Sequence, residues 1–220
     1  MVDSESAGRE PVRRVIYFAD PMCSWCWGFA PVIAAVHDML GAWAPISPVM
    51  GGLRPGTINP MRDKDKAAVR HHWEAVHKET GQPFDFSLFD RDNFVYDTEP
   101  ACRAVVAVRS VAPEQTLRYL HAVQRAFYAE GRDVTTAATL ADIAGEFGIG
   151  AEAFADMFAA PDMAAATRAD FKLTQSAGIS GFPSVILQQA DEFAPLTVGY
   201  RPFALLQPHL QAWMNAASAS

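Results

Sequence analysis

Apolar residues near the start of the chain follow two different spacings. A continuous β-branched and aromatic run predicts a buried strand from Val12 to Phe18. Apolar positions then recur at helical spacing from Phe29 to Leu40, and a second apolar run predicts a strand from Ile46 to Met50. Because a strand, a helix and a strand follow one another within about 40 residues, we expect a βαβ unit with parallel strands.

The middle of the chain shows only helical patterns. Apolar residues at helical spacing predict about six helices between residues 62 and 178, and one of them begins at a Thr98 cap. Two short apolar runs, at 183–189 and 194–200, then predict strands, and the last segment predicts a helix that Pro208 kinks or breaks. The patterns together predict an α/β domain that is interrupted by a block of helices.

Composition narrows the classes of partner. The 220 residues are 50% hydrophobic and carry a formal net charge of −7, without a cluster of Lys and Arg. We therefore expect neither nucleic acid nor an anionic membrane surface as a partner. No apolar run approaches the roughly 20 residues that cross a bilayer, so we expect no membrane-spanning segment. The stretch before Pro11 is polar and lacks the apolar core of a secretory signal, which favours a flexible tail over residues 1–10 and a cytoplasmic location.

Two of the three cysteines stand three residues apart in the stretch DPMCSWCWGF, where the first predicted strand gives way to a helix. Three cysteines are too few for a disulfide scaffold, and a cytosolic Cys-x-x-Cys pair is typically catalytic or metal-binding. The positive end of a helix stabilises a thiolate at Cys23, and Cys26 faces the same side of the helix. This spacing favours a dithiol that closes to a disulfide, with Cys23 as the exposed nucleophile and Cys26 as its shielded partner.

A zinc site is the main alternative for this pair. Zinc in a structural site needs four ligands, and Cys102 and the six histidines are the remaining candidates. His71, His72 and His77 lack the i, i+4 spacing that places two ligands on one helix face, and the chain has no second Cys-x-x-Cys. The spacing therefore favours the dithiol, and we expect no metal.

Three further residues have two interpretations each. Asp20 is either a proton acceptor for Cys26 through water or, more simply, a loop residue that caps the first helical turn. Cys102 is either a third redox thiol or, as its apolar helical neighbours favour, a small buried core residue. Pro183 opens a predicted strand, and because only about 5–6% of X–Pro bonds in folded proteins are cis, this residue alone favours a trans bond.

Four segments, DPMCSWCWGFAP, DTEPACRAVVAVR, VQRAFYAEGRDVT and GFPSVIL, resemble the DsbA family of the thioredoxin-like superfamily. Within that family they are similar to the FrnE-like branch of predicted disulfide isomerases. The resemblance implies an α/β, thioredoxin-like fold with a large all-helical insertion. It implies a discontinuous thioredoxin-fold domain at 11–56 and 161–220, with the helical insertion at 57–160.

The resemblance also implies roles for single residues. Cys23 matches the family's nucleophile, Cys26 its resolving cysteine, and Pro183 a cis-proline that lies against the disulfide. The backbone of Phe182 would pair with an extended substrate, and Trp25 would help to line the substrate site. Phe182 is bulkier than the Val or Thr often found there, and the Ser-Trp pair between the cysteines differs from the Pro-His of the best-known member. The shape of the substrate groove and the redox potential therefore stay open.

We accordingly expect a cytoplasmic thiol–disulfide oxidoreductase or isomerase that acts on protein or small-molecule thiols and disulfides. It would hold no tightly bound cofactor, and glutathione is a candidate redox co-substrate. Two alternatives remain open. One is a glutathione-dependent isomerase or transferase that acts on a small molecule, and the other is a non-catalytic metal-binding or chaperone-like module.

Overall fold

A mixed sheet forms the centre of the protein, whose computed structural model describes residues 13–218. Within that range four strands, β1 (Arg13–Ala19), β2 (Ile46–Met50), β3 (Ser184–Gln189) and β4 (Glu192–Val198), lie in the order β2-β1-β3-β4. β1 pairs with β2 in parallel and with β3 antiparallel, and β3 pairs antiparallel with β4. The parallel β1–β2 pair with an intervening helix is the βαβ unit that the apolar spacing predicts.

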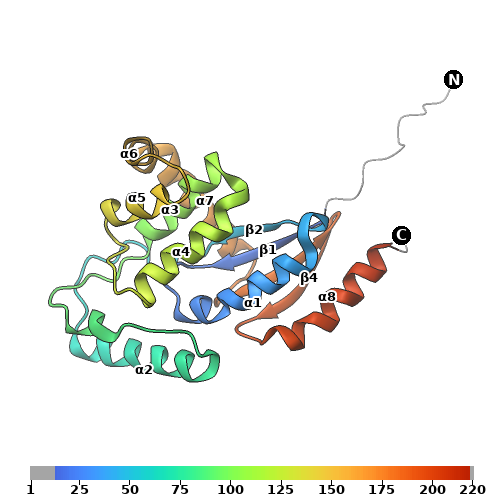
Figure 1. Ribbon diagram of the computed structural model, residues 1–220, viewed down its shortest axis with the longest axis horizontal. Helices are drawn as coiled ribbons and strands as arrows, with labels where there is room; N and C mark the ends of the chain where they lie inside the picture. Colours follow the sequence, from blue (N-terminus) through green and yellow to red (C-terminus); the bar gives the residue numbers. More distant parts are fainter. Residues whose placement is uncertain (1–12, 219–220) are drawn as a thin grey trace.

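Helices cover this sheet. α1 (Ser24–Leu40) and α8 (Phe203–Ser218) pack against each other and lie in front of the sheet in Figure 1, whereas α7 (Pro161–Ser176) packs against β2. The remaining helices are inserted between β2 and α7; they are α2 (Asp63–Thr80), α3 (Glu99–Val111), α4 (Thr116–Tyr128), α5 (Ala137–Gly145) and α6 (Ala151–Ala159).

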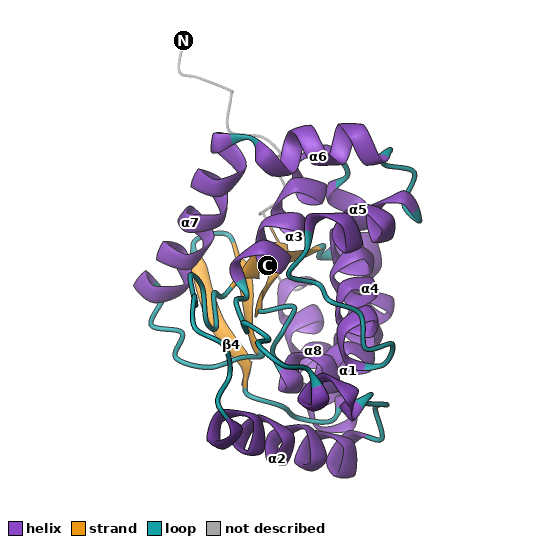
Figure 2. Cartoon of the chain, turned by 90° about the vertical axis from the view of Figure 1, so that its left-hand side faces the viewer, coloured by secondary structure: helices purple, strands orange, loops and turns teal. Residues whose placement is uncertain are grey.

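The inserted helices occupy two separate places. α3, α4, α5 and α6 pack on one another at one end of the protein, and α2 lies alone at the opposite end, beside the start of α1 (Figures 1 and 2). α2 packs against α1. The division into a sheet domain and a helical insertion with a boundary at residues 56 and 161 stays a prediction.

One apolar cluster joins the sheet to the inserted helices. Trp73 of α2 is fully buried, and its ring contacts the rings of Phe84, Phe86, Phe89, Phe127 and Tyr128. Aromatic pairs in edge-on or tilted contact add about 0.5–1.5 kcal/mol each beyond the area that they bury. These contacts therefore hold α2, which has few helical neighbours, against the end of α4.

Two local expectations were wrong, one of them in part. Pro208 does not break α8, which runs without interruption through it, whereas a kink at this residue stays a prediction. The proline removes one backbone hydrogen bond, but Leu206 and Leu210 on either side are completely buried, and their burial outweighs that loss. Thr98 precedes α3 as expected, yet its side chain caps no helical N–H; its Oγ1 accepts a hydrogen bond of 3.1 Å from the backbone N–H of Arg54 instead.

An ion pair covers the outer edge of the sheet at β2. Arg109 of α3 and Asp170 of α7 form two N–H···O bonds of 2.8 and 2.9 Å. The Arg109 guanidinium also donates to the carbonyl oxygen of Pro48, and the Asp170 carboxylate accepts from the backbone N–H of Met50. The pair thus satisfies backbone groups of an edge strand that would otherwise be open to pairing with another chain.

Asp170→Ala should lower the free energy of unfolding by about 3 kcal/mol, because it leaves a mostly buried Arg109 unpaired and the Met50 N–H without its acceptor. Urea denaturation followed by circular dichroism measures the change. Arg168→Ala, at an exposed position of the same helix, is the control and should change the value by less than about 0.5 kcal/mol. Equal effects of the two substitutions would contradict this account of the β2 edge.

Candidate active site

The two cysteines of the Cys-x-x-Cys motif lie at the start of α1. Cys23 is the N-cap residue, with an extended backbone (φ −93°, ψ 116°), and Cys26 follows in the first turn. Both are free thiols. Cys26 is completely buried, whereas Cys23 is 7% exposed and lines a hollow of about 230 Å³. Cys23 is therefore the thiol that a dissolved disulfide can reach, and Cys26 is the one behind it.

The segment around Pro183 lies directly against the dithiol. The Phe182–Pro183 peptide bond is cis, and the Cys23 thiol donates to the carbonyl oxygen of Phe182 over 3.7 Å. The register of the sheet explains this contact between residues far apart in the sequence. Ser184, the first residue of β3, pairs with Phe18 near the end of β1, and the cysteines follow β1.

Phe182 fits beside the dithiol because residue 51 is a glycine. The Phe182 ring lies over Gly51, where a Cβ atom would overlap three atoms of the ring. Gly51 is held in place because its backbone N–H donates to the carbonyl oxygen of Ala19 over 2.7 Å. The Phe182 ring therefore fills a space that Gly51, the first residue after β2, leaves free. This contact answers how the site accommodates a residue bulkier than Val or Thr before the proline.

Trp27 joins α1 to the segment that follows α2. Pro31 lacks the N–H that would bond to the carbonyl oxygen of Trp27, and the side chain of Gln82 donates to that oxygen over 3.0 Å. The indole N–H of Trp27 donates to the carbonyl oxygen of Pro83, also over 3.0 Å. Both bonds hold residues 82 and 83, and with them the end of α2, against the helix that carries the dithiol.

The hollow at Cys23 has an apolar side and a basic side. Trp25 and Phe182 line it together with the cysteine, and Arg54 and His72 contribute the basic side chains. His72 belongs to α2, so the inserted helix supplies one wall. A second hollow of about 630 Å³ shares the residues Trp25 and Phe182 and is also lined by Tyr200, Lys78 and Glu79.

Asp20 is completely buried between the dithiol and the inserted helices. Its carboxylate accepts hydrogen bonds from the backbone N–H groups of Met22, over 2.8 Å, and Leu53, over 2.7 Å. Neither group belongs to the first turn of α1, so Asp20 does not act as the helix cap that its position suggested. Burial raises the pKa of Asp20 above its usual value, and hydrogen bonds from the two N–H groups only partly oppose that effect.

Burial also determines the protonation state of the Cys26 thiol. It raises the pKa of this thiol well above its usual value, and the neighbouring Cys23 raises the pKa further. The backbone N–H of Asp20 donates to the Cys26 sulfur and acts in the opposite direction. Cys26 is therefore a neutral thiol at neutral pH, and it needs a proton acceptor nearby before it can attack a disulfide.

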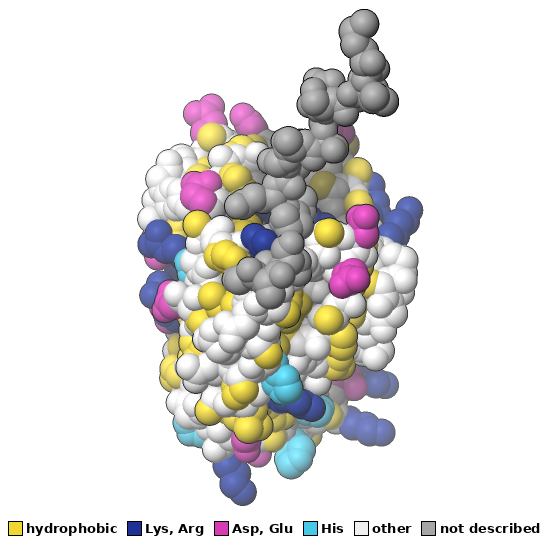
Figure 3. All heavy atoms as spheres, turned by 90° about the vertical axis from the view of Figure 1, so that its right-hand side faces the viewer, with side chains coloured by type: hydrophobic (Ala, Val, Ile, Leu, Met, Phe, Trp, Pro, Cys, Tyr) yellow, Lys and Arg dark blue, Asp and Glu magenta, His cyan; other side chains and the backbone are white. Residues whose placement is uncertain are grey.

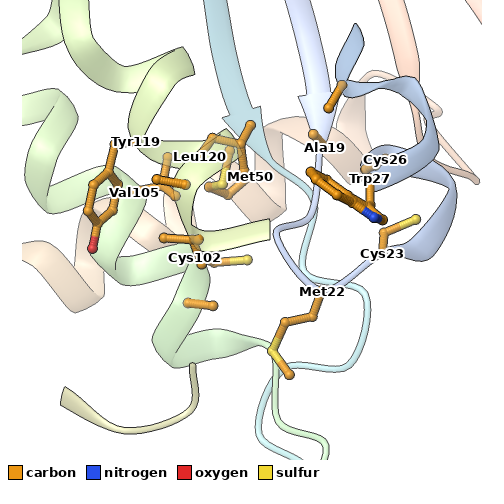
Figure 4. Close-up of a cluster of buried hydrophobic side chains, with 14 of the residues drawn as sticks. Ala19, Met22, Cys23, Cys26, Trp27, Met50, Cys102, Val105, Tyr119 and Leu120 are labelled. Atoms are coloured by element: carbon orange, nitrogen blue, oxygen red, sulfur yellow. The ribbon is translucent and has the colours of Figure 1, made fainter. Parts of the chain in front are cut away.

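Cys102 is a completely buried side chain in α3, as its apolar neighbours favoured. Its thiol donates to the Asp20 carboxylate over 3.4 Å. Figure 4 shows Cys102 on the far side of the segment after Ala19 from Cys23 and Cys26, with its sulfur directed toward that segment. Sequence spacing missed this contact because it joins two separate elements.

The histidines of α2 do not gather with the cysteines as ligands. Among the residues that the structure describes, no group of three or more His, Cys, Asp and Glu side chains is placed to hold a metal ion. His77 lies near Gln82, whose carbonyl oxygen is 2.7 Å from the His77 Nδ1.

In the described part of the chain no helix has the length and apolarity needed to span a bilayer. Figure 3 shows one face of the protein, on which acidic and basic side chains are interspersed.

Comparison with known proteins agrees with this geometry. A solved structure of a "putative protein disulfide isomerase" from Nitrosomonas europaea is 38% identical, with a TM-score of 0.87, and the match covers 94% of this chain and 99% of that one. The cytosolic disulfide reductase DsbM from Pseudomonas aeruginosa is 27% identical, with a TM-score of 0.77, and the match covers 92% and 99% of the two chains. DsbM has also been solved with GSH.

Similarity to curated sequences is lower. The ClpXP adapter protein SpxH of Halalkalibacterium halodurans is 23% identical over 208 residues, which are 91% of this chain and 67% of that protein. The match to SpxH of Bacillus subtilis covers 56% of that protein.

The model of the DSBA-like thioredoxin domain family matches residues 14–211. Because this match spans most of the chain, the chain belongs to the DSBA-like thioredoxin domain family.

Proposed function

We propose that this protein is a thiol–disulfide oxidoreductase in which Cys23 is the nucleophile and Cys26 the resolving cysteine. The contact between the Cys23 thiol and the carbonyl oxygen of Phe182, with Cys26 buried behind it, is the observation that carries the proposal. One reachable thiol and one shielded thiol lie beside an accessible backbone segment, and this supports a site in which that segment binds the substrate. Membership of the DSBA-like family and the similarity to a disulfide reductase support the same assignment.

Reduction of a substrate disulfide takes two exchange steps. The Cys23 thiolate attacks one sulfur of the substrate, forms a mixed disulfide and releases the other sulfur as a thiolate. Cys26 then gives its proton, through a bridging water, to the Asp20 carboxylate and attacks the Cys23 sulfur, which releases the second substrate thiolate and leaves a Cys23–Cys26 disulfide. Two electrons pass from the dithiol to the substrate, and the same bonds exchange in reverse when the oxidised protein accepts electrons from a substrate dithiol.

The substrate segment would bind along the backbone of Phe182. This residue precedes β3 and lies between the two hollows, with its carbonyl oxygen toward Cys23. An extended peptide beside it could pair in the manner of strand addition, while Trp25 and the Phe182 ring contact its side chains. Pro183 lies next to the paired residue and would limit how closely the segment approaches the sulfurs.

Glutathione is the redox co-substrate that we propose. It is a small peptide with carboxylates and a central thiol, and Arg54 and His72 provide basic groups in the hollow that contains Cys23. The structure of DsbM with GSH supports this choice by similarity. A cytoplasmic location, the lack of a nucleic-acid partner and membership of the FrnE-like branch stay predictions, as do the two alternative functions.

Cys23→Ser should abolish reduction of insulin and exchange with glutathione, because the variant has no thiol that a dissolved disulfide can reach. Cys26→Ala should keep the first attack and accumulate a mixed disulfide at Cys23, which mass spectrometry of the trapped protein detects. Undiminished reduction by Cys23→Ser would contradict the proposal. Glutathione binding that survives loss of both cysteines would favour the isomerase or transferase, and stoichiometric metal in the purified protein would favour the metal-binding module.

Gly51→Ala should slow mixed-disulfide formation with a peptide disulfide by at least about tenfold, since the new methyl group displaces the Phe182 ring and with it the backbone beside Cys23. Stopped-flow fluorescence of the tryptophans at the site can follow this step. Gly181→Ala, in the loop that carries Phe182, meets no atom within 4 Å and is the control. If both variants react at the rate of the unaltered protein, Phe182 does not shape the substrate site.

Arg54→Ala should raise the KM for glutathione disulfide by about fivefold, because an exposed charge pair is worth up to roughly 1 kcal/mol. The uncharged bis(2-hydroxyethyl) disulfide is the comparison substrate, and its KM should not change. Arg54→Lys retains the positive charge and should recover most of the loss. An equal rise in KM for the two substrates would mean that Arg54 supports the fold of the site and does not bind carboxylates.

A further inference from the structure

The third cysteine has a place in the site that the exchange steps above do not use. Cys102 is completely buried, and its thiol donates to the Oδ2 atom of Asp20 over 3.4 Å. The backbone N–H of Gly52 donates to the Cys102 sulfur. The thiol is therefore held from both sides, and its hydrogen points at the carboxylate that we propose as the proton acceptor for Cys26.

Hydrogen-bond donors surround the Asp20 carboxylate. Two are the backbone N–H groups of Met22 and Leu53, and two are the side chains of Thr98 and Cys102. All four favour the ionised carboxylate and oppose the desolvation that burial causes. Because Asp20 is completely buried, loss of any one donor shifts its proton equilibrium more than the same loss would at the surface.

The four donors differ in what they can do when Asp20 takes up a proton. A backbone N–H group only donates, whereas a hydroxyl or a thiol can turn and accept. The Thr98 oxygen already accepts from the N–H of Arg54 over 3.1 Å. Thr98 and Cys102 are thus the two neighbours whose hydrogen bond to Asp20 can reverse direction while the backbone stays in place.

We propose that Cys102 is a positioning residue without a redox role, whose thiol holds the Asp20 carboxylate ready to accept the Cys26 proton and so sets the pH range in which the mixed disulfide is resolved. This inference rests on the proposed function. In this step Cys26 loses a proton to Asp20 through a bridging water, its sulfur bonds to the Cys23 sulfur, and the bond from Cys23 to the substrate sulfur breaks with release of a thiolate. Cys102 keeps its own hydrogen and its oxidation state throughout.

The environment of Cys102 opposes a redox role. Burial raises the pKa of its thiol well above the usual value, and the nearby charge of Asp20 raises the pKa further. A neutral, buried thiol is a poor nucleophile and is out of reach of a dissolved oxidant. The segment after β1 separates it from the two active-site cysteines (Figure 4).

The other groups near Asp20 do not replace the thiol as a source of pH dependence. The titratable and charged groups that face Asp20 or its neighbours come from β1, α1 and its N-cap, α3, the end of α4 and the loops before α3; they are Tyr17, Cys23, Cys26, Cys102, Tyr96, Tyr128, Glu99 and Arg54. Burial raises the pKa of Cys26, of Cys102 and of the three tyrosines, so these five groups are uncharged at neutral pH. Arg54 lies over the Tyr96 ring, 5.1 Å from its centre.

The test compares Cys102→Ala with Cys102→Ser in the full chain. Reduced protein is mixed with glutathione disulfide at a series of pH values from about 5 to about 9, which extends about two units on either side of neutrality. Rapid acid quench and mass spectrometry then give the rates at which the Cys23–glutathione mixed disulfide forms and decays. Cys102→Ala removes a donor to the carboxylate, which raises the pKa of Asp20 and leaves less of the proton-accepting form at low pH.

The rate at which the mixed disulfide decays should rise with pH through a midpoint. We expect Cys102→Ala to move this midpoint upward by about one pH unit and to slow the decay about tenfold at pH values below it. Cys102→Ser keeps a donor, and because a hydroxyl donates more strongly than a thiol, this variant should show a lower midpoint than the unaltered protein. If both variants lose the decay step, Cys102 is a redox thiol; if both retain the original profile, it is only a core residue. Either result overturns the inference, whereas failure of the unaltered protein to form the mixed disulfide overturns the proposed function.

A second measurement applies if Cys102→Ala folds poorly. The C=O stretch of the protonated Asp20 can be followed by difference infrared spectroscopy during a pH titration of the unaltered protein and of Cys102→Ser, with Asp20→Asn to assign the band. A midpoint that is lower in Cys102→Ser than in the unaltered protein supports the hydrogen bond, because a hydroxyl is a stronger donor than a thiol. A midpoint that is unchanged or moves upward in Cys102→Ser would contradict it.

Discussion

The pairing of β1 with β3 is the constraint on which the site depends. Phe18 lies opposite Ser184 in this antiparallel pair, so the end of β1 and the start of β3 meet at one edge of the sheet. The dithiol follows β1 and the Phe182–Pro183 segment precedes β3, and the pairing therefore brings the Cys23 sulfur to the carbonyl oxygen of Phe182. A shift by one residue would turn every side chain of β3 to the other face and separate the two parts of the site.

The inserted helices complete this site in two different ways. α2 lies beside the start of α1 and supplies His72, Lys78 and Glu79 to the walls of the two hollows. α3 works from the interior, because it carries Cys102 to the Asp20 carboxylate. One part of the insertion thus lines the two hollows, and the other contacts the carboxylate that we propose as the proton acceptor. The charge of the substrate and the pH dependence of the reaction can accordingly change through different helices.

Residues that act through local spacing could be predicted, and those that act through distant contacts could not. The strand at Ile46–Met50, the dithiol at the start of a helix and the DsbA-like fold all follow from patterns within a few residues or from a resemblance. The cap at Thr98 was wrong because a backbone N–H from the loop after β2 competes for the hydroxyl. Pro208 remains within α8 because burial of its neighbours outweighs one lost hydrogen bond. The contacts of Asp20 with Leu53 and Cys102 join three segments, and no periodicity along the chain reports them.

The contact between Gly51 and Phe182 has a consequence for how such a protein can evolve. While an aromatic ring occupies position 182, any side chain at position 51 overlaps it, so the two positions are epistatic. A smaller residue must arise at 182 before position 51 can vary, and the reverse order passes through a displaced loop. Exchange of Phe182 for a smaller residue is thus open in one direction, while a return to the aromatic residue requires that the glycine at position 51 has been retained.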